Sequence, residues 1–470
     1  MSTAIVWFRR DLRVEDNPAL DAALRAHDRI ACIYIHAPGE ESPWAPGAAS
    51  RWWLHHSLSA LDGQLRRRGA ALTLLLGPTA AALHRAVDAA GARAVYWNRL
   101  YEPAIQKRDT GIKQELRGRG IDAHSFNANV LCEPWQVQTG QGAPYRVFTP
   151  FWRNVRARLE AYPPIPAPVQ INATRLDSGT DLESLRLLPR ISWHAGFNEV
   201  WQVGERGAQS RLQRFLDDAI GDYRSGRDRP DRDDTSMLSP HLHFGEIGPR
   251  QILWRIHERS GDAMAREAAE PYVRELGWRE FSHHLLYHFP QTPQASLNRQ
   301  FEHFPWAPEN RQALERWRRG TTGIPIVDAG MRQLWTTGWM HNRVRMIVAS
   351  FLTKNLRQHW RFGARWFWDT LLDADLANNT QGWQWTAGCG ADAAPYFRIF
   401  NPVTQGERFD PNGDYVRRWV PELRAAPAAL IHQPWADAAL LRETGYPAPM
   451  VDLRQSREAA LAAYRESRGG

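Results

Sequence analysis

The first third of the chain alternates short β-branched runs with amphipathic stretches, and this alternation limits the possible folds more than any other feature. Helical patterns such as SRWWLHHSLSALDGQLRRRG separate the runs. Strands that alternate with helices predict a parallel sheet with helices on both faces, because such strands are buried on both sides. No GxGxxG follows the first run, so we expect no NAD fingerprint here. The expected strands are AIVWF (4–8), IACIYIHA (30–37), ALTLLLG (71–77) and RAVYWN (93–98).

The pattern changes beyond the first third. The chain becomes irregular, with proline-rich stretches such as YPPIPAPVQ, and then helical periodicity takes over without strand patterns. At 470 residues the chain is too long for one ordinary domain. We therefore expect an α/β domain at 1–133, a long linker at 134–200 and an all-α domain at 201–470.

Charge and tryptophan content indicate the kind of partner. The net charge of +8 suits an anionic partner such as nucleic acid, although a merely basic enzyme fits the charge equally well. The 22 tryptophans exceed what a core needs, and stacking on bases or on a flat cofactor would explain some of them. Cys32, Cys132 and Cys389 form no CxxC pair and no metal-ligand set. We expect a cytoplasmic monomer with no membrane segment and no metal.

Two segments of the helical part carry polar side chains in patterns typical of binding sites. In DDTSMLSPHLHFGEIGPRQ, the hydroxyls of Thr235, Ser236 and Ser239 lie just before helix starts, which favours a phosphate contact over N-capping alone. In YVRELGWREFSHH, one helix face is too polar for a core and too aromatic for a solvated surface, which favours binding. That face comprises Glu275, Trp278, Arg279 and Ser282.

Two further segments combine charge with amides. In GWMHNRVRMIVASFLTKNL, one helix face is apolar, while the other offers Asn342, Arg345 and Met346. The acids of DADLANNTQGWQW, Asp373 and Asp375, can pair with Arg345, and a buried pair of this kind is costly unless it is used. His284 and His288 are spaced for a metal, but no third ligand is near, so ordinary hydrogen-bonded histidines are favoured.

Taken in order, the motifs resemble those of the DNA photolyase and cryptochrome family, and most closely those of bacterial class I cyclobutane pyrimidine dimer photolyases. The likeness runs nearly from end to end, and each motif is specific. The motifs that carry it are WFRRDLRVEDNPAL, PYRVFTPFW, LSPHLHFGEI, LGWREF, GIPIVDAGMRQLWTTGWMHNRVRMIVASFLTKNL and DADLANNTQGWQWTAGCGADAAPYFRIFNPVTQGERFD.

The resemblance implies an N-terminal α/β domain, a long linker and a helical domain that binds FAD. Residues that would hold the FAD phosphates and sugar are Tyr223, Thr235, Ser236, Met237, Leu238 and Ser239. Residues that would line the flavin or the adjoining pocket are Glu275, Arg279, Trp339, Asn342, Arg345, Asp373, Asp375 and Asn379. Asn379 would face flavin N5, where a neutral amide can hydrogen-bond without giving up a proton by ionising.

The resemblance also implies light-driven repair of a dimer flipped out of UV-damaged DNA, and photolyases are themselves an established case of base flipping. The tryptophans that would carry electrons to the flavin are Trp306, Trp360 and Trp383. The dimer would meet Glu275, Trp278, Arg279, Met346 and Trp385. The arginines that would hold the DNA backbone are Arg227, Arg232, Arg343 and Arg398.

Several alternatives accompany this interpretation. Asn342 and Met346 follow the cyclobutane-dimer pattern, whereas (6-4) photolyases carry histidines in this helix. A cryptochrome photoreceptor is the second alternative, and Asn379 argues against it. A basic tryptophan-rich module for single strands is the third, and it leaves the acids of DADLANNTQGWQW without a role. Folate-binding relatives carry Asn-Glu shortly after a Tyr-Glu pair, but Ala104 and Ile105 stand there, so folate, deazaflavin or no second chromophore are all open.

Overall fold

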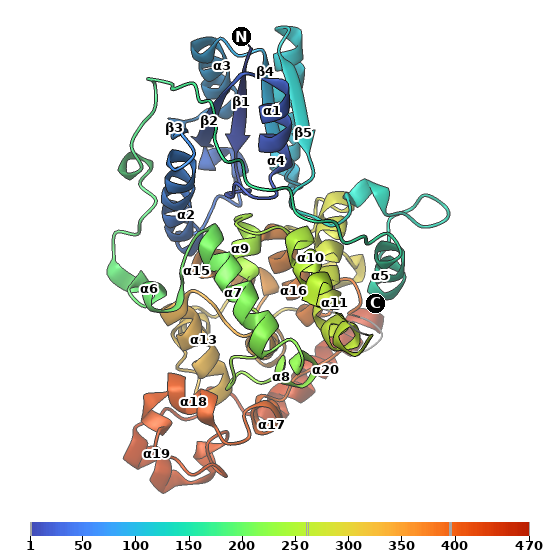
Figure 1. Ribbon diagram of the computed structural model, residues 1–470. Coiled ribbons are helices and arrows are strands. Elements are labelled where there is room, and N and C mark those ends of the chain that lie inside the picture. The colour runs from blue at the N-terminus through green and yellow to red at the C-terminus, as the bar shows by residue number, and fades with distance from the viewer. Residues whose placement is uncertain (1, 260, 262, 394–396, 470) are drawn as a thin grey trace.

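The computed structural model describes residues 2–259, 261, 263–393 and 397–469. At one end lies a single sheet of parallel strands in the order β3-β2-β1-β4-β5, and the other end is helical (Figure 1). The strands are β1 (Thr3–Phe8), β2 (Arg29–His36), β3 (Leu72–Leu76), β4 (Ala94–Asn98) and β5 (Asp122–Phe126). The expected parallel sheet is confirmed, and β5 is an additional edge strand that the sequence did not predict.

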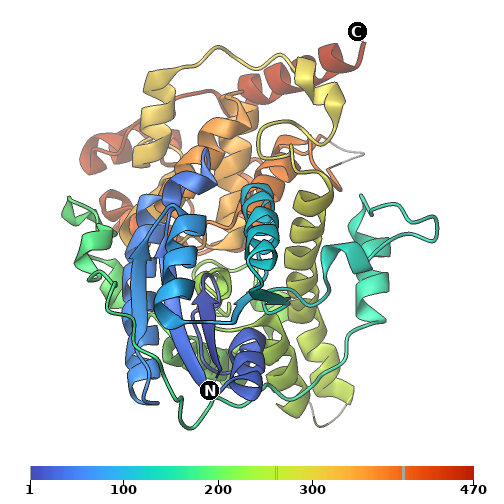
Figure 2. The same cartoon turned by 90° about the horizontal axis from the view of Figure 1, so that it is seen from above.

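The four strands β1 to β4 are buried on both faces, as their continuous apolar runs predicted, whereas the edge strand β5 has exposed positions. In β1, Ala4, Val6 and Phe8 pack into one core, whereas Ile5 and Trp7 pack into another. The first core contains residues of α1 (Pro18–Ala26) and α2 (Ala48–Arg66). The second contains residues of α3 (Thr79–Ala90) and α4 (Pro103–Gly118). Helices therefore cover both faces of the sheet (Figure 2).

The connection between sheet and helices is held against the sheet. It contains α5 (Phe148–Arg156) and α6 (Phe197–Val200). Between them the backbone N–H of Ile30 donates to the carbonyl of Asn172 (2.9 Å), and that of Thr180 donates to the carbonyl of Leu74 (2.8 Å). This segment runs beside the α/β domain down to α6 (Figure 1). The expected division at residues 133 and 200 stays a prediction.

The helical part surrounds a core that includes Trp317, Val344 and Val348. The apolar face predicted around α14 is buried, and a π-helical turn, Phe351–Asn355, continues it. The α-helices in this part are α7 (Glu205–Asp218), α8 (Tyr223–Gly226), α9 (Ser239–His243), α10 (Pro249–Arg259), α11 (Ala263–His288), α12 (Arg311–Arg319), α13 (Pro325–Thr337), α14 (Asn342–Ser350), α15 (Trp360–Thr370), α16 (Leu376–Ala387), α17 (Pro402–Phe409), α18 (Asp414–Trp419), α19 (Ala438–Thr444) and α20 (Leu453–Gly469). Within the described ranges, no helix is long and apolar enough to cross a membrane.

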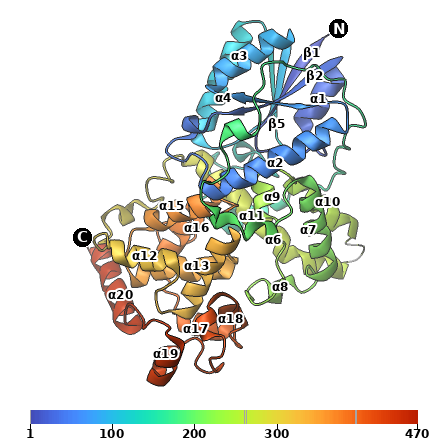
Figure 3. The same cartoon turned by 90° about the vertical axis from the view of Figure 1, so that its left-hand side faces the viewer.

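Buried polar contacts join the sheet domain to the helices. Helix α2 lies between the two parts (Figure 3), and the indole N–H of Trp53 donates to Glu246 (3.0 Å). The fully buried Arg13 donates to the carbonyls of Gly245 (2.9 Å) and Ala128 (3.1 Å). Gly245 has φ +64°, and a Cβ there would lie 2.6 Å from the Cα of Asp11, so this close approach requires glycine. The site described next is therefore fixed relative to both domains.

Candidate functional site

The segment between α8 and α9 presents hydroxyls on a turned backbone. Met237 has φ +48°, a left-handed conformation that is uncommon for a residue with a Cβ. The Ser236 hydroxyl accepts a hydrogen bond from the backbone N–H of Leu238 (3.3 Å). Thr235 and Ser239 are half-buried, whereas Leu238 is buried. Such a turn, with hydroxyls and amides before a helix, is suited to an anion.

Distant parts of the chain meet this segment. The hydroxyl of Tyr272 donates to Ser236 (3.1 Å), and its ring lies edge-on to that of Tyr223 at 5.3 Å. On the other side, the indole N–H of Trp339 donates to the Ser239 hydroxyl (3.3 Å). The structure therefore brings together three separate stretches of the chain that were expected to hold a cofactor. Tyr272 was not predicted, although it lies on the same face of α11 as Glu275 and Arg279.

A charged pair lies beside this cluster. Arg345 donates from Nη1 and Nη2 to the two oxygens of Asp373 (3.1 and 2.8 Å) and from Nε to the carbonyl of Met340 (2.8 Å). Its guanidinium also lies 5.9 Å from the ring of Trp339. Two-point contact of this kind fixes the guanidinium plane. The pairing of Arg345 with Asp373 that the sequence predicted is confirmed.

Asp375 does not share that role, which corrects the expectation that both acids pair with Arg345. One of its oxygens caps α16 by accepting from the N–H of Asn378 (2.8 Å), as a helix N-cap does. The other faces His243 (3.7 Å) and His283 (3.5 Å). Burial alone would raise the pKa of Asp375, but the charge of His283 and the contact with His243 hold this pKa well below its usual range. Burial opposes charge on His283 as well, yet Asp375 raises the pKa of that histidine.

Asn379 is held through its amide nitrogen, which donates to the carbonyl of Ala364 (3.0 Å). Within the part of the chain that the structure describes, no hydrogen bond is made to the amide oxygen, which can therefore accept one from a ligand. On α14, Asn342 is exposed and Met346 is half-buried, so both can be reached from outside.

The predicted polar face of α11 is only partly a surface. Glu275 pairs with Arg227 (2.5 Å), and Arg279 donates to the carbonyl of Asn129 (2.7 Å) in the sheet domain. Trp278 stacks on Phe148 of α5, with ring centroids 3.6 Å apart and planes at 7°. Ser282 is an exception to the prediction. It is buried and donates to the carbonyl of Trp278 in its own helix (3.0 Å).

The tryptophans expected to carry electrons differ in exposure. Trp383 and Trp360 are buried, and Trp306 is half-buried. The ring of His359 lies between the outer two, 5.0 Å from Trp306 and 5.6 Å from Trp360. Trp383 packs against α15, where a Cβ built on Gly363 would lie 2.5 Å from Cζ2 of its ring.

Arg398, Trp385 and Phe400 form a cluster that we call the outer rim. Arg398 is exposed and lies 5.5 Å over the ring of Trp385, which in turn stacks at 6.4 Å with Phe400. Arg232 is also exposed, whereas Arg343 is half-buried. A narrow hollow opens beside this rim. It is lined by Trp385, Thr386, Gly388, Asp392, Ala393, Arg398 and Phe400.

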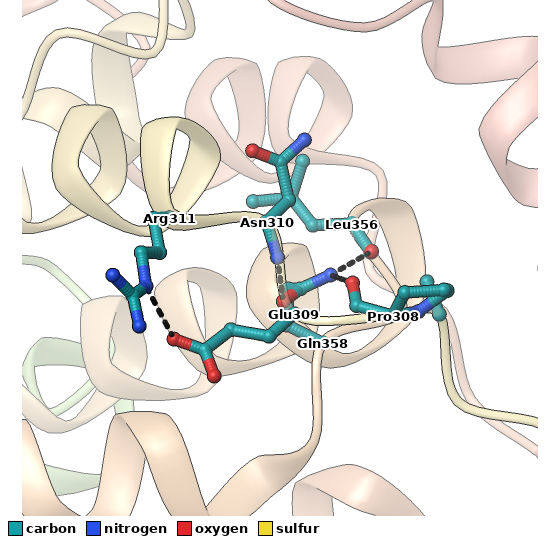
Figure 4. Close-up of a pocket in the computed structure, with 7 residues that line it drawn as sticks. Pro308, Glu309, Asn310, Arg311, Leu356 and Gln358 are labelled. Carbon is teal, nitrogen blue, oxygen red and sulfur yellow. Dashed lines mark hydrogen bonds and ion pairs between the residues drawn. The ribbon is translucent and has the colours of Figure 1, made fainter.

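Other features lie apart from this cluster. A shallow surface hollow near α12 is bridged by Gln358, which accepts from the N–H of Asn310 (3.1 Å) and donates to the carbonyl of Pro308 (3.0 Å) (Figure 4). His284 accepts from the N–H of Tyr145 (3.0 Å), and His288 contacts the carbonyl of Pro134 (3.1 Å). Among the described residues, no group of three or more His, Cys, Asp or Glu side chains could hold a metal ion.

Tyr101 and Glu102, the pair that bears on the second chromophore, both contact other parts of the chain. The Tyr101 hydroxyl donates to Glu133 (2.9 Å), and Glu102 pairs with Arg10 (2.5 Å). Of the two residues that replace the Asn-Glu pair, Ala104 is exposed and Ile105 is buried. A second chromophore stays an expectation.

Comparison with known proteins agrees with this geometry. The family model described as "DNA photolyase" matches residues 4–169, and that described as "FAD binding domain of DNA photolyase" matches residues 272–466. A deoxyribodipyrimidine photo-lyase of Agrobacterium fabrum is 45% identical over 98% of this chain and 97% of its own length. The chain belongs to the DNA photolyase family.

Two further relatives show the breadth of this family. A crystal structure of a bacterial class III photolyase from Agrobacterium tumefaciens has a TM-score of 0.95 at 44% identity, and the match covers 100% of this chain and 98% of that one. That structure is of a class III photolyase, whereas the motifs led us to expect class I. Cryptochrome-1 of Arabidopsis thaliana is 39% identical over 97% of this chain and 69% of its own length. The family is confirmed, together with its α/β and helical FAD-binding parts.

The residues present fit FAD. Hydroxyls and a left-handed turn at 235–239 suit a diphosphate, while Arg345, fixed by Asp373, and the free amide oxygen of Asn379 suit the polar edge of a flavin. Trp339 links the two groups through Ser239. The sequence did not predict the two histidines facing Asp375, because they come from helices far away in the chain.

Proposed function

We propose that this protein repairs cyclobutane pyrimidine dimers in DNA in a light-dependent reaction that uses bound FAD. The observation that carries the proposal is the neutral amide of Asn379. This residue lies on α16, and its amide nitrogen donates to the carbonyl of Ala364 on α15. An amide cannot ionise, so it can accept a hydrogen bond without supplying a proton to the flavin. The photolyase of Agrobacterium fabrum, similar over nearly its whole length, supports the same function.

The chemistry that FAD supplies when bound, reduced and excited by light is the loan of one electron to the dimer. Two carbon–carbon bonds of the cyclobutane ring break, the electron returns, and no net oxidation or reduction remains. The protein's own task is to hold the dimer and exclude competing reactions. Glu275 would hydrogen-bond the dimer, while Trp278 and Trp385 would contact its rings. Arg279, fixed by the carbonyl of Asn129, would border the same pocket.

The rest of the site would bind DNA and prepare the cofactor. Arg227, Arg343, Arg398 and Arg232 would hold phosphates of the lesion-bearing strand. Electrons that reduce the flavin would enter through Trp306, Trp360 and Trp383. Asn342 and Met346, accessible on α14, favour the cyclobutane dimer over the (6-4) lesion. A cytoplasmic monomer completes the proposal, and size-exclusion chromatography with light scattering tests the oligomeric state.

Repair of defined lesions tests the function. One oligonucleotide carries a thymine cyclobutane dimer and another carries a (6-4) lesion, and each is incubated with protein and reductant under blue light or in darkness. We expect loss of the cyclobutane dimer only, and only in light. If neither lesion disappears while FAD is bound and reduced by light, the protein is a cryptochrome-type photoreceptor instead. Loss of the (6-4) lesion alone would contradict the roles given to Asn342 and Met346.

A further inference from the structure

Two of the arginines proposed to hold DNA already have acidic partners. Arg343 donates from Nε (3.2 Å) and Nη2 (2.7 Å) to a single oxygen, Oδ1, of Asp228. The neighbouring Arg227 pairs with Glu275 (2.5 Å). The side chains of Arg343 and Asp228 are 17% and 33% exposed, so water and ions reach this pair. Each arginine is thus neutralised in the free protein while remaining accessible.

Asp228 is not needed to orient Arg343. The guanidinium of Arg343 lies 4.4 Å from the centre of the Phe409 ring. The backbone N–H of Arg343 donates to the His341 ring (3.2 Å). A cation stacked on a ring keeps its plane without a carboxylate. Asp228 also uses only one oxygen, whereas Asp373 grips Arg345 with two. Because the ion pair is partly exposed and uses only one carboxylate oxygen, it contributes little to the free energy of folding.

The outer arginines differ from these two. Arg398 is exposed over Trp385, and no ion pair joins it to an acid among the described residues. Such a cation can hold any duplex at the surface. A phosphate that takes the Nε and Nη2 donors of the recessed Arg343 must displace a carboxylate of the same charge. Binding there therefore differs from binding at the rim.

We propose that Asp228 competes with DNA phosphate for Arg343. It holds the guanidinium while the site is empty, gives way as the lesion-bearing strand enters, and returns as the repaired strand leaves. Asp228 thereby weakens the hold on DNA and speeds release. This inference rests on the proposed function, because it requires DNA at this face.

Binding of a duplex with one cyclobutane dimer tests the inference in the dark, where no repair occurs. We expect Asp228→Asn to bind this duplex about two- to fivefold more tightly, the range of a partly exposed ion pair. The dissociation rate should fall by a similar factor. The slope of log affinity against log salt concentration should also become steeper by roughly one unit. In the parent, the displaced Asp228 carboxylate takes up a cation when DNA binds, and the asparagine of the variant does not.

Two controls distinguish competition between Asp228 and phosphate from a general effect of removing a negative charge. Asp233→Asn removes the same charge from the same loop. Asp233 is exposed and, among the described residues, Arg343 pairs with Asp228 instead. It should leave the salt slope unchanged. In Asp228→Asn combined with Arg343→Gln, the gain in affinity should vanish. Asp228→Asn should retain bound FAD as the parent does, which shows that the variant is folded.

The outcomes are distinguishable. Weaker binding and a flatter salt slope in Asp228→Asn would mean that Asp228 positions Arg343, and unchanged binding would mean that DNA does not reach Arg343. Either result overturns the inference and leaves the proposed function intact. If the parent protein does not prefer damaged over undamaged duplex, the proposed function fails instead.

Discussion

Gly363 gives the sharpest test of how Trp383 is packed. A Cβ added at this position in α15 would lie 2.5 Å from Cζ2 of Trp383 and nearer still to two other ring carbons. Carbon atoms pack at about 3.5–4.0 Å, so the ring and the helix must separate by about 1 Å or more in Gly363→Ala. Such overpacking costs about 1–3 kcal/mol, and the better helix propensity of alanine returns at most about 1 kcal/mol.

Gly382 offers a matched control on the neighbouring helix. It lies inside α16, next to Trp383 in sequence, but a Cβ there meets nothing within 4 Å. Gly382→Ala should therefore gain up to about 1 kcal/mol from helix propensity alone. The two variants should differ by about 1–3 kcal/mol in the free energy of unfolding, with Gly363→Ala the less stable.

Urea unfolding measures that difference, and photoreduction of FAD under blue light measures its consequence for Trp383. We expect Gly363→Ala to reduce its flavin more slowly than the parent, because the displaced ring no longer keeps its place in the electron path. Gly382→Ala should reduce its flavin at the parental rate. Equal stabilities together with equal photoreduction rates in the two variants would refute this account of Trp383.

Three further substitutions test individual contacts. Asn379→Asp should accumulate less reduced FAD under light, because a carboxyl group can exchange a proton with the flavin; unchanged flavin absorbance spectra during illumination would contradict this role. Asp373→Asn leaves Arg345 without its two-point partner and should weaken FAD retention by about tenfold, or about 1.4 kcal/mol, measured by fluorescence of released flavin. Asp375→Asn keeps the α16 cap but removes the charge that raises the pKa of His283. That contribution is complete below about pH 6.5 and is lost as pH rises through the folded His283 pKa, so the urea midpoint should fall more at pH 6 than at pH 8; an equal fall at both would refute the pairing.

Local patterns predicted much of the sheet domain. The first four strands were predicted because each is an apolar run buried on both sides. β5 was missed because DAHSF lies at the sheet edge, has only Ala123 buried between two exposed residues, and carries little apolar signal. The course of residues 171–180 along the sheet could not be predicted either. Backbone hydrogen bonds hold it, and these leave no trace in side-chain composition.

Within the site, whether a side-chain pair could be predicted depended on how far apart its residues lie along the chain. Arg345 and Asp373 are 28 residues apart and face each other from neighbouring elements, so charge alone suggested their pairing. Asp228 and Arg343 are 115 residues apart, and no local periodicity links them. Helix phase was also insufficient for Ser282, which shares a predicted face with Glu275 but is buried by its neighbours. Long-range packing decides such cases.

The central claim is that the protein lends an electron to the dimer and recovers it. The most direct test is anaerobic turnover, in which protein with fully reduced FAD and no other reductant receives excess cyclobutane-dimer oligonucleotide under blue light. We predict that many dimers are split per FAD and that the flavin is still fully reduced at the end. At most two dimers split per FAD, one for each electron that reduced FAD holds, with the flavin left oxidised, would contradict the claim.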